Sequence, residues 1–257
     1  MEPLTPVPAA LRALLGAGFF ALFLGAWWFV TWAGIVPPLF LASPGRTLMA
    51  GWALLAEYGF AADIAVTIWR VVGGFLIAAA LGVPLGLMMG AFKLVEAFFE
   101  PFISFARYLP ASAFIPLLIL WAGVGEAQKL SVIVIGSVFQ VVIMVAVIAG
   151  ATRPELVEAA RTLGARRGGI LGRVIIPAAA PQVMEALRLV LGWAWTYVTV
   201  AELVGATSGI GHMIMDSQRL LDTGQMIFGI VTIGLIGLVT DLAFRLLNRR
   251  LFPWATL

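Results

Sequence analysis

Residues 158–177 read EAARTLGARRGGILGRVIIP, a charged and glycine-rich stretch between two long apolar segments. The chain of 257 residues is 62% hydrophobic and only 11% charged, with a mean hydropathy of +1.05. A soluble domain carries about a quarter charged residues. In so apolar a chain, a polar stretch of this length lies outside the lipid. The five arginines between Arg153 and Arg173 place it on the cytoplasmic side.

The residues at the start of this stretch predict a short, capped helix. Residues 152–155, Thr-Arg-Pro-Glu, fit a capping box, with a hydroxyl at the N-cap and a carboxylate three residues later. The helix would run to Leu163 and stop at Gly164, because glycine readily adopts the left-handed conformation that ends a helix. Leu156, Ala160 and Leu163 would then form one apolar stripe.

A second short helix is expected over residues 166–173, separated from the next span by Pro177 and Pro181. A solvated loop that only obeys the positive-inside rule is the simpler interpretation of so many arginines. Such a connector, however, needs neither a capped amphipathic helix nor a glycine stop. Ala159 and Ala160 also offer a surface small enough for close backbone approach. We therefore interpret the segment as a rigid lever that docks into a groove of a partner.

Six apolar segments are each long enough to cross a hydrocarbon core of about 30 Å as a helix. The third contains Pro110 and Pro116, and such breaks are tolerated in a bilayer where protein or a water-lined cavity satisfies the freed backbone. The prediction is an all-α integral membrane protein with about six transmembrane helices, near residues 11–35, 71–92, 105–121, 130–149, 183–206 and 226–247.

Two regions are expected along the chain. Residues 1–59 would hold a Pro-rich tail, the first transmembrane helix and an external segment. The first apolar segment lacks a clear small-residue cleavage site, so we interpret it as a retained helix and not as a signal peptide. Residues 60–257 would form the core with five spans and the cytoplasmic loop 152–177.

The basic residues set the orientation. With both termini inside, the cytoplasmic side receives 12 of the 16 basic residues, so N-in and C-in is the predicted topology. The external set is Arg46, Arg70, Lys129 and Arg219, and the cytoplasmic set is Arg12, Lys93, Arg107, Arg153, Arg161, Arg166, Arg167, Arg173, Arg188, Arg245, Arg249 and Arg250.

Several classes of function are excluded by composition. The chain has no cysteine and one histidine, so thiolate zinc sites, iron–sulfur clusters and multi-histidine metal or haem sites cannot be built. There is no GxxxxGK[ST] sequence for a P-loop of its own. No basic stretch is interleaved with surface aromatics, so nucleic acid is not an expected partner. We predict no catalytic residues and no metal site.

The polar segment resembles the EAA loop of permease subunits of binding-protein-dependent ABC importers. That pattern is Glu-Ala-Ala, three residues, Gly, nine residues, Ile, one residue and Leu-Pro. The chain matches it at Glu158-Ala159-Ala160 and Gly164, with Val174 for the isoleucine and Ile176-Pro177 for Leu-Pro. The two departures are conservative and apolar. We call residues 152–177 the EAA segment.

Further matches resemble the nitrate, sulfonate and taurine branch of these permeases, and together the similarity covers about residues 60–255. Tyr108 replaces the proline that this branch usually has after the arginine. The matching stretches are residues 107–110 (RYLP), 114–117 (FIPL), 121–126 (WAGVGE), 201–203 (AEL), 209–211 (GIG) and 249–254 (RRLFPW).

The resemblance implies the fold of a type I ABC importer permease whose EAA segment includes a coupling helix. Its coupling residues would be Glu158, Ala159, Ala160, Leu163 and Gly164. The implied partners are ATP-binding cassette subunits, which bind ATP and Mg, and a periplasmic or lipid-anchored solute-binding protein. Because the chain has no convincing internal repeat, a second copy would complete a homodimer. The implied location is the bacterial inner membrane.

The resemblance favours a small anion as solute, such as nitrate, taurine, a sulfonate or bicarbonate, with a pyrimidine-type vitamin precursor as the alternative. A self-contained secondary transporter or channel would have no use for the lever. A membrane-embedded enzyme would lack the residues to build a site. Possible residues of the translocation path are Arg107, Tyr108, Trp195, Thr199 and Glu202.

Two of these path residues leave alternatives open. Glu202 either organises or gates the path, or packs at the external interface and pairs with a neighbouring helix. A carboxylate inside a span costs roughly 2.5–3.5 kcal/mol, so it should face protein or water. Arg107 precedes the proline break of the third span. It is either a path cation for an anion or a cytoplasmic anchor.

Overall fold

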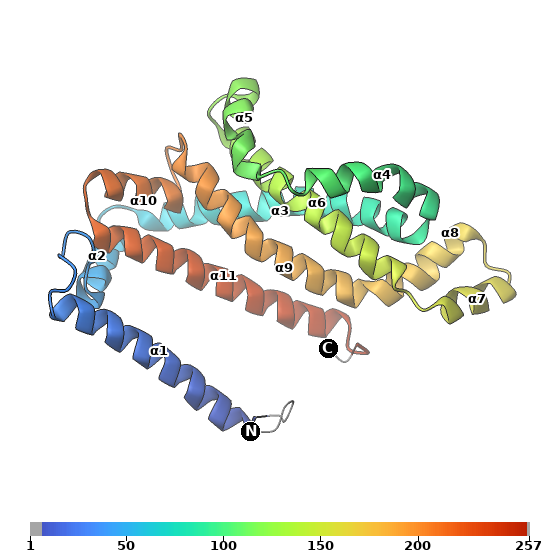
Figure 1. The fold of residues 1–257 in the computed structure, drawn as a ribbon, viewed down its shortest axis with the longest axis horizontal. Helices are drawn as coiled ribbons and strands as arrows, with labels where there is room; N and C mark the ends of the chain where they lie inside the picture. The colour runs from blue at the N-terminus through green and yellow to red at the C-terminus, as the bar shows by residue number, and fades with distance from the viewer. Residues whose placement is uncertain (1–6, 256–257) are drawn as a thin grey trace. The chain divides into compact units, whose positions relative to one another are not determined.

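The computed structural model describes residues 7–255, which form helices joined by short turns (Figure 1). Residues 1–6 of the predicted tail lie outside the described part of the chain. In chain order the elements are α1 (Ala9–Trp32), α2 (Pro44–Ala56), α3 (Phe60–Ala91), α4 (Lys93–Ala106), the 3₁₀-helix η1 (Ala111–Phe114), α5 (Ile115–Ala122), α6 (Glu126–Gly150), α7 (Pro154–Thr162), α8 (Arg167–Ile170), the π-helix η2 (Leu171–Ile175), α9 (Ile176–Leu203), α10 (Ile210–Arg219) and α11 (Thr223–Leu251).

The prediction of about six membrane spans is confirmed. Among the described residues, five helices are long and apolar enough to cross a membrane, and a bent pair makes a sixth when it is counted as one broken span. The five are α1, α3, α6, the continuous helix Arg167–Leu203 and α11. The bent pair joins α4 to η1 and α5 with an angle of 82° at the break. The predicted bounds of the third span were wrong, because α4 already begins at Lys93 and Pro110 precedes η1 instead of lying inside one helix.

A second correction concerns the residues after α7. Pro177 and Pro181 do not separate a short helix from the next span, since α8, η2 and α9 form one helix of 37 residues. The π-helical turn over Leu171–Ile175 ends two residues before Pro177. Proline removes one N–H and crowds the carbonyl four residues earlier, and a local change of hydrogen-bond register accommodates both effects without ending the helix.

The chain divides into two compact units. Unit 1 contains the described residues up to Phe60 together with Met213–Val231, and unit 2 contains Ala61–His212 together with the residues from Thr232 onward. Within unit 1, the Ser43 hydroxyl accepts a hydrogen bond from the Arg46 N–H and caps α2. α1 has no buried residue.

A stripe of glycines on α3 positions α6 in unit 2. A Cβ added at Gly74 would lie 2.7 Å from Cβ of Ile133, and one added at Gly90 would lie 2.7 Å from Cβ of Ala149. Gly82 and Gly86 make equally close approaches to residues of α6 between these two points. The partners advance along α6 as the glycines advance along α3, so the helices run parallel. Small residues at four-residue spacing allow this close contact between membrane helices.

α9 runs antiparallel to α6 and lies beside it (Figure 1). Ala201, near the end of α9, packs with Val132 near the start of α6. Ile175, just before α9, packs with Ala149 near the end of α6. The EAA segment therefore lies at one end of unit 2, and the starts of α3 and α6 meet the end of α9 at the other. The 25 residues of α6 span about 37 Å between these ends.

The break between α4 and η1 lies about halfway along α6. Ile103 of α4 packs with Val142, in the second half of α6. Ile115 of α5 packs with Val132, in the first half. Residues 107–110 connect these two levels. The break is therefore at mid-height of unit 2 and not at either of its ends.

Candidate functional site

The EAA segment forms the predicted short helix, with a different cap. α7 covers Pro154–Thr162, and its N-cap is Arg153, which makes no side-chain capping bond. The predicted capping box at Thr152 is wrong, because Thr152 lies in the turn that follows α6: its N–H bonds to the Ala149 carbonyl. The Thr152 hydroxyl is buried there and has no hydrogen-bond partner among the described residues. The predicted stop is confirmed, since Gly164 has φ +80°.

The buried face of α7 also differs from the predicted stripe. Val157 and Ala160 pack against a small core that contains Ala149, Ile170 and Ile175. Leu156 is exposed, and Leu163 is 87% exposed. The start of the helix Arg167–Leu203 covers the side of α7 that carries Val157, and this tertiary contact decides which face is buried.

The outer face of α7 is open. Glu158, Ala159, Leu163 and Gly164 are all exposed. Of the predicted coupling residues, Ala160 alone packs partly into the core of unit 2. A Cβ at Gly164 would meet nothing within 4 Å. The small Ala159 therefore lies on a convex, accessible helix that a partner could enclose closely.

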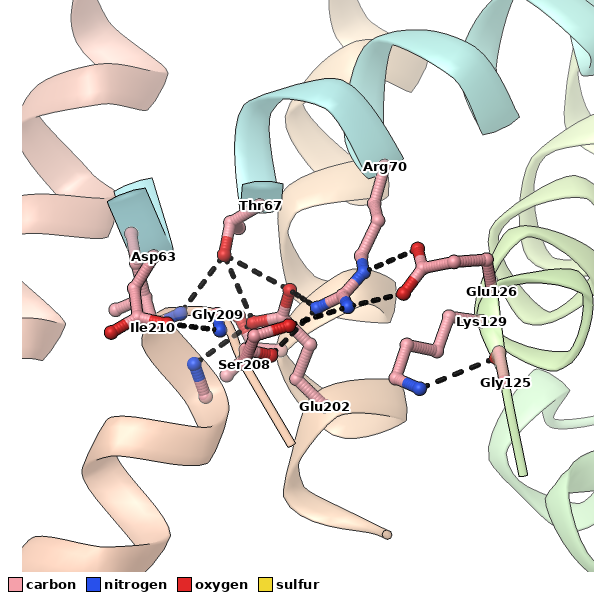
Figure 2. Close-up of polar contacts among 12 residues, drawn as sticks. Asp63, Thr67, Arg70, Gly125, Glu126, Lys129, Glu202, Ser208, Gly209 and Ile210 are labelled. Carbon is pink, nitrogen blue, oxygen red and sulfur yellow. Dashed lines mark hydrogen bonds and ion pairs between the residues drawn. The ribbon is translucent and has the colours of Figure 1, made fainter. Parts of the chain in front are cut away.

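A buried ion-pair cluster joins the starts of α3 and α6 to the end of α9, at the end of unit 2 opposite the EAA segment. Figure 2 shows its contacts. Its centre is Arg70 of α3, which is 1% exposed. The Arg70 Nε donates to Glu126 Oε2 at 2.8 Å, and Nη2 donates to the other carboxylate oxygen of Glu126. Nη1 donates to Glu202 Oε1 at 2.8 Å and to the Ser208 carbonyl at 2.7 Å. One guanidinium thus joins α3, α6, α9 and the turn after α9.

Glu202 is fully buried and fully hydrogen-bonded. The Thr67 hydroxyl donates to its carboxylate, 2.9 Å from Oε1 and 3.1 Å from Oε2. The Gly211 N–H, at the start of α10, donates to Oε2 at 2.9 Å. A carboxylate is favourable at a helix N-terminus, where N–H groups are unpaired. Arg70, Thr67 and Gly211 together supply the donors that a buried carboxylate requires.

The turn between α9 and α10 is held by the same cluster. The Ile210 N–H donates to Thr67 Oγ1 at 2.9 Å, and the Gly209 N–H donates to Asp63 Oδ1 at 2.6 Å. Gly209 has φ +107°, and a Cβ there would lie 2.7 Å from Arg70 Nη1. Glycine is therefore the residue that permits both the backbone conformation and the approach of the guanidinium.

The cluster is unevenly accessible. The Glu126 side chain is 53% exposed, whereas that of Glu202 is fully buried. Lys129, one turn along α6 from Glu126, is also buried, and its Nζ donates to the Gly125 carbonyl at 3.2 Å. The charges of Arg70 and Lys129 offset those of the two glutamates, so the cluster is compact and nearly neutral before Asp63 is counted.

The break between α4 and η1 carries an exposed arginine–tyrosine pair. Arg107 Nη2 lies 2.8 Å from the Tyr108 hydroxyl, and its guanidinium carbon lies 4.7 Å from the centre of the Tyr108 ring. Tyr108 is 75% exposed. Because this break is at mid-height of unit 2, Arg107 does not belong with the residues that mark one face of the membrane.

Comparison with known proteins places these features in a family. The family described as "Binding-protein-dependent transport system inner membrane component" matches residues 82–253, which include the EAA segment, the Arg107 break and Glu202. This chain belongs to that family. Its role is therefore that of a permease subunit of an ABC importer, as the EAA segment led us to expect.

Curated relatives cover nearly the whole permease. It is 33% identical to the taurine transport system permease protein TauC of Escherichia coli, over 96% of this chain and 92% of TauC. It is also 33% identical to a putative aliphatic sulfonates transport permease protein, SsuC of Bacillus subtilis, over 91% of this chain and 85% of that protein. The nitrate import permease protein NrtB of Synechocystis is 26% identical over 77% of this chain and 72% of NrtB.

Solved structures share the fold of the permease. The MetNI methionine ABC transporter in an inward-facing form gives a TM-score of 0.63 at 21% identity, covering 77% of this chain and 96% of that one. An amino acid ABC transporter gives 0.62 at 20% identity, covering 78% and 97%. The predicted fold of a type I ABC importer permease is confirmed.

Two other predicted path residues lie within the permease's own helix packing. Trp195 is buried, and its Nε1 donates to Thr240 Oγ1 of α11 at 3.3 Å. Thr199 Oγ1 donates to the Trp195 carbonyl at 2.8 Å, within α9. Glu202 is buried against α3, which matches the alternative of pairing with a neighbouring helix. Arg107 and Tyr108 are thus the exposed members of the predicted set that the structure brings together.

Arg70 was missed as a functional residue by sequence reasoning, which counted it as an external basic residue. A signal was available. Asp63, Thr67 and Arg70 are spaced by four and three residues in an otherwise apolar stretch, so they share one face of a helix. Polar residues on one face of a membrane helix face protein or a water-filled cavity.

Proposed function

We propose that this permease forms the path for a small organic or inorganic anion in an ATP-driven importer. The relatives named above are named for taurine, aliphatic sulfonates and nitrate, and all of these solutes carry an anionic group. This shared chemistry favours an anion over the pyrimidine-type alternative. The exposed Arg107 at mid-height supplies a cation where such a solute would pass.

The outer face of α7 is the surface proposed to dock into the ATP-hydrolysing subunit. Glu158, Ala159, Leu163 and Gly164 would contact that subunit directly, because all of them are exposed. Ala160 would act from the other side, by packing α7 against the core of unit 2. The permease would contain no cofactor, and ATP and Mg would bind to the partner subunits.

The remaining assembly follows from this orientation. α7 would face the cytoplasm with both termini on the same side, and the Arg70 cluster would lie near the external surface. A solute-binding protein would deliver the anion at that surface. Two copies of the chain would enclose one path in the bacterial inner membrane. Residues 60–257 would form the core of each copy.

The geometry suggests how motion at α7 could reach the path. α6 ends next to α7 and begins at Glu126, while the helix Arg167–Leu203 begins after α7 and ends beside Glu202. Both helices therefore run from the EAA segment to the ion-pair cluster. Nucleotide bound at one end and the loaded binding protein at the other would shift the equilibrium between two packings of the same helices.

The proposed assembly is tested by co-purification. The full chain, carrying an affinity tag, is extracted from its native membrane in mild detergent. We expect a P-loop ATPase to co-purify in stoichiometric amount, and ATP hydrolysis to rise when a loaded binding protein is added. A purified chain that transports solute in vesicles with no ATPase present would instead indicate a secondary transporter or channel.

The role of Arg107 is tested by uptake. Arg107→Gln should reduce uptake about 10- to 150-fold, because a charge-assisted hydrogen bond to an anion contributes about 1.5–3 kcal/mol. Uptake is measured in vesicles with the assembled importer, using taurine, an alkanesulfonate and nitrate as separate probes. Arg107→Lys keeps the charge and serves as the partial rescue. Arg250→Gln, at the end of α11, is the control. If Arg107→Gln takes up solute at the normal rate, Arg107 is not a path residue and the alternative of an anchor holds.

A further inference from the structure

A cavity of about 430 Å³ lies beside the EAA segment. Its walls come from parts of unit 2 that are distant in sequence: the end of α3, the turn into α4, the end of α6, and the α7–α8 region. The residues that carry charge or a hydroxyl there are Lys93, Thr152, Arg161 and Arg167. None of them was assigned to the docking face of α7 or to the ion-pair cluster.

The electrostatics of the cavity favour an anion. Lys93, Arg161 and Arg167 line it, and no carboxylate of the described residues does. Lys93 pairs with Glu96, but that lysine side chain is 83% exposed and the pair is a solvated one. Within residues 7–255, Arg161 and Arg167 have no carboxylate within ion-pair distance. Two guanidiniums thus face the same space uncompensated, and guanidinium is the side-chain group best suited to phosphate.

A hydrogen-bond donor is also unused in this place. Thr152 lines the cavity, and its hydroxyl is buried with no partner in the described chain. A buried hydroxyl without a hydrogen bond costs about 1–3 kcal/mol, so a bound acceptor would relieve that cost. Three cations therefore line the cavity from the α3–α4 turn and the EAA segment, and its wall beside the end of α6 contains a hydroxyl without a partner among the described residues.

The rest of the lining is apolar. The larger apolar side chains of the remaining wall are Phe92, Leu94, Val157, Ile170, Leu171 and Ile175, and glycines and alanines complete it. The cavity also lies where α3 and α6 end, which is the level at which membrane helices leave the lipid. A ligand with an anionic head and an apolar body matches this division better than a fully hydrated ion does. Basic pockets between membrane helices on the cytoplasmic side are suited to lipid head groups.

We propose that this cavity binds the phosphate group of an anionic phospholipid. The inference rests on the proposed function only for the orientation that puts α7 at the cytoplasmic surface. The phosphate would join Arg161 of α7 to Lys93 of the α3–α4 turn. The lipid would thereby fix the angle of α7 relative to the rest of unit 2. The anionic lipid content of the membrane would then determine how firmly α7 transmits movement of the ATPase to the membrane helices.

The test measures lipid binding to the purified full-length permease without its ATPase. Phosphatidylglycerol is titrated into the detergent-solubilised protein, and native mass spectrometry gives the affinity of the first bound lipid. A basic residue near the lipid surface contributes about 1 kcal/mol, which is about fivefold. The double variant Arg161→Gln/Arg167→Gln should therefore bind about 30-fold more weakly. Thr152→Val should bind about tenfold more weakly, through loss of a charge-assisted hydrogen bond.

A matched control removes two charges from the same segment. Arg153 and Arg166 are exposed neighbours that do not line the cavity, so Arg153→Gln/Arg166→Gln should leave the affinity unchanged. If the two double variants lose equal lipid affinity, the effect is one of general surface charge and the proposal is overturned. Displacement of the lipid by inorganic phosphate alone would assign the cavity to a soluble ion and also overturn it.

Two further outcomes distinguish a failure of the lipid proposal from a failure of the proposed function. If Arg161→Gln/Arg167→Gln binds lipid normally but no longer co-purifies with an ATPase, the cavity belongs to the docking surface and the lipid proposal fails. If no ATPase co-purifies with any form of the chain while the lipid affinities change as expected, the proposed function fails and the lipid site stands.

Discussion

Arg70→Met is expected to destabilise the permease by about 3–5 kcal/mol, because it leaves the buried carboxylate of Glu202 without its counter-charge. Glu202 keeps its hydrogen bonds from Thr67 and Gly211, but these are neutral donors. The loss also frees the turn at Ser208, which Arg70 holds through the carbonyl and the hydroxyl. The free energy of unfolding in detergent is followed by tryptophan fluorescence, since the chain has nine tryptophans and no cysteine for a thiol dye.

Two comparisons make the Arg70 result specific. Arg219→Met removes an arginine that is 71% exposed and pairs with an exposed Asp216, and such pairs contribute at most about 1 kcal/mol. Arg70→Met/Glu202→Met removes both buried charges, so it should recover part of the lost stability. If Arg70→Met were no less stable than Arg219→Met, the cluster would not be a structural centre of the fold.

Ala159→Trp is expected to reduce ATP-driven uptake to background while the protein still inserts and folds. Ala159 is exposed and does not contribute to the core, so the larger side chain finds room in the isolated chain. In the assembled importer it would prevent the close approach of the ATPase to α7. The measurement pairs uptake in vesicles with the amount of ATPase that co-purifies, and both should fall together.

The choice of Ala159 over its neighbour matters for this experiment. Ala160 packs against the core of unit 2, so a tryptophan there would disturb the fold and the docking face at once. The control is Ala122→Trp, an exposed alanine close in sequence to Glu126 and therefore at the end of unit 2 away from α7. Uptake by Ala159→Trp at the level of Ala122→Trp would contradict a docking role for the outer face of α7.

The features that sequence reasoning obtained correctly depend on nearby residues. The spans follow from apolar runs, and the stop at Gly164 follows from one glycine after a short helix. The EAA pattern is a local spacing as well. It pointed to the family that the comparisons then established. In each case the residues that carry the signal are at most a few turns apart.

The features that sequence reasoning missed depend on residues that are distant in the chain. Arg70 lies 56 residues from Glu126 and 132 from Glu202, so counting basic residues near span ends treated it as a solvated marker of topology. Thr152 was expected to cap α7, but the end of α6 determines its position. The packed face of α7 was assigned from periodicity, and the returning helix selected Val157 instead of Leu163.

The wide turn over Leu171–Ile175 adds a residue to the returning helix without rotating its two parts against each other. A π-turn holds one residue more than an α-turn, and both complete about one full rotation. Deleting a single residue there would therefore close a regular α-turn and keep Arg167 at nearly the same azimuth relative to Glu202. A deletion elsewhere in the helix, where each residue advances the side chains by about 100°, would rotate Arg167 away from that azimuth. The wide turn is thus the part of this helix that best tolerates a change of length.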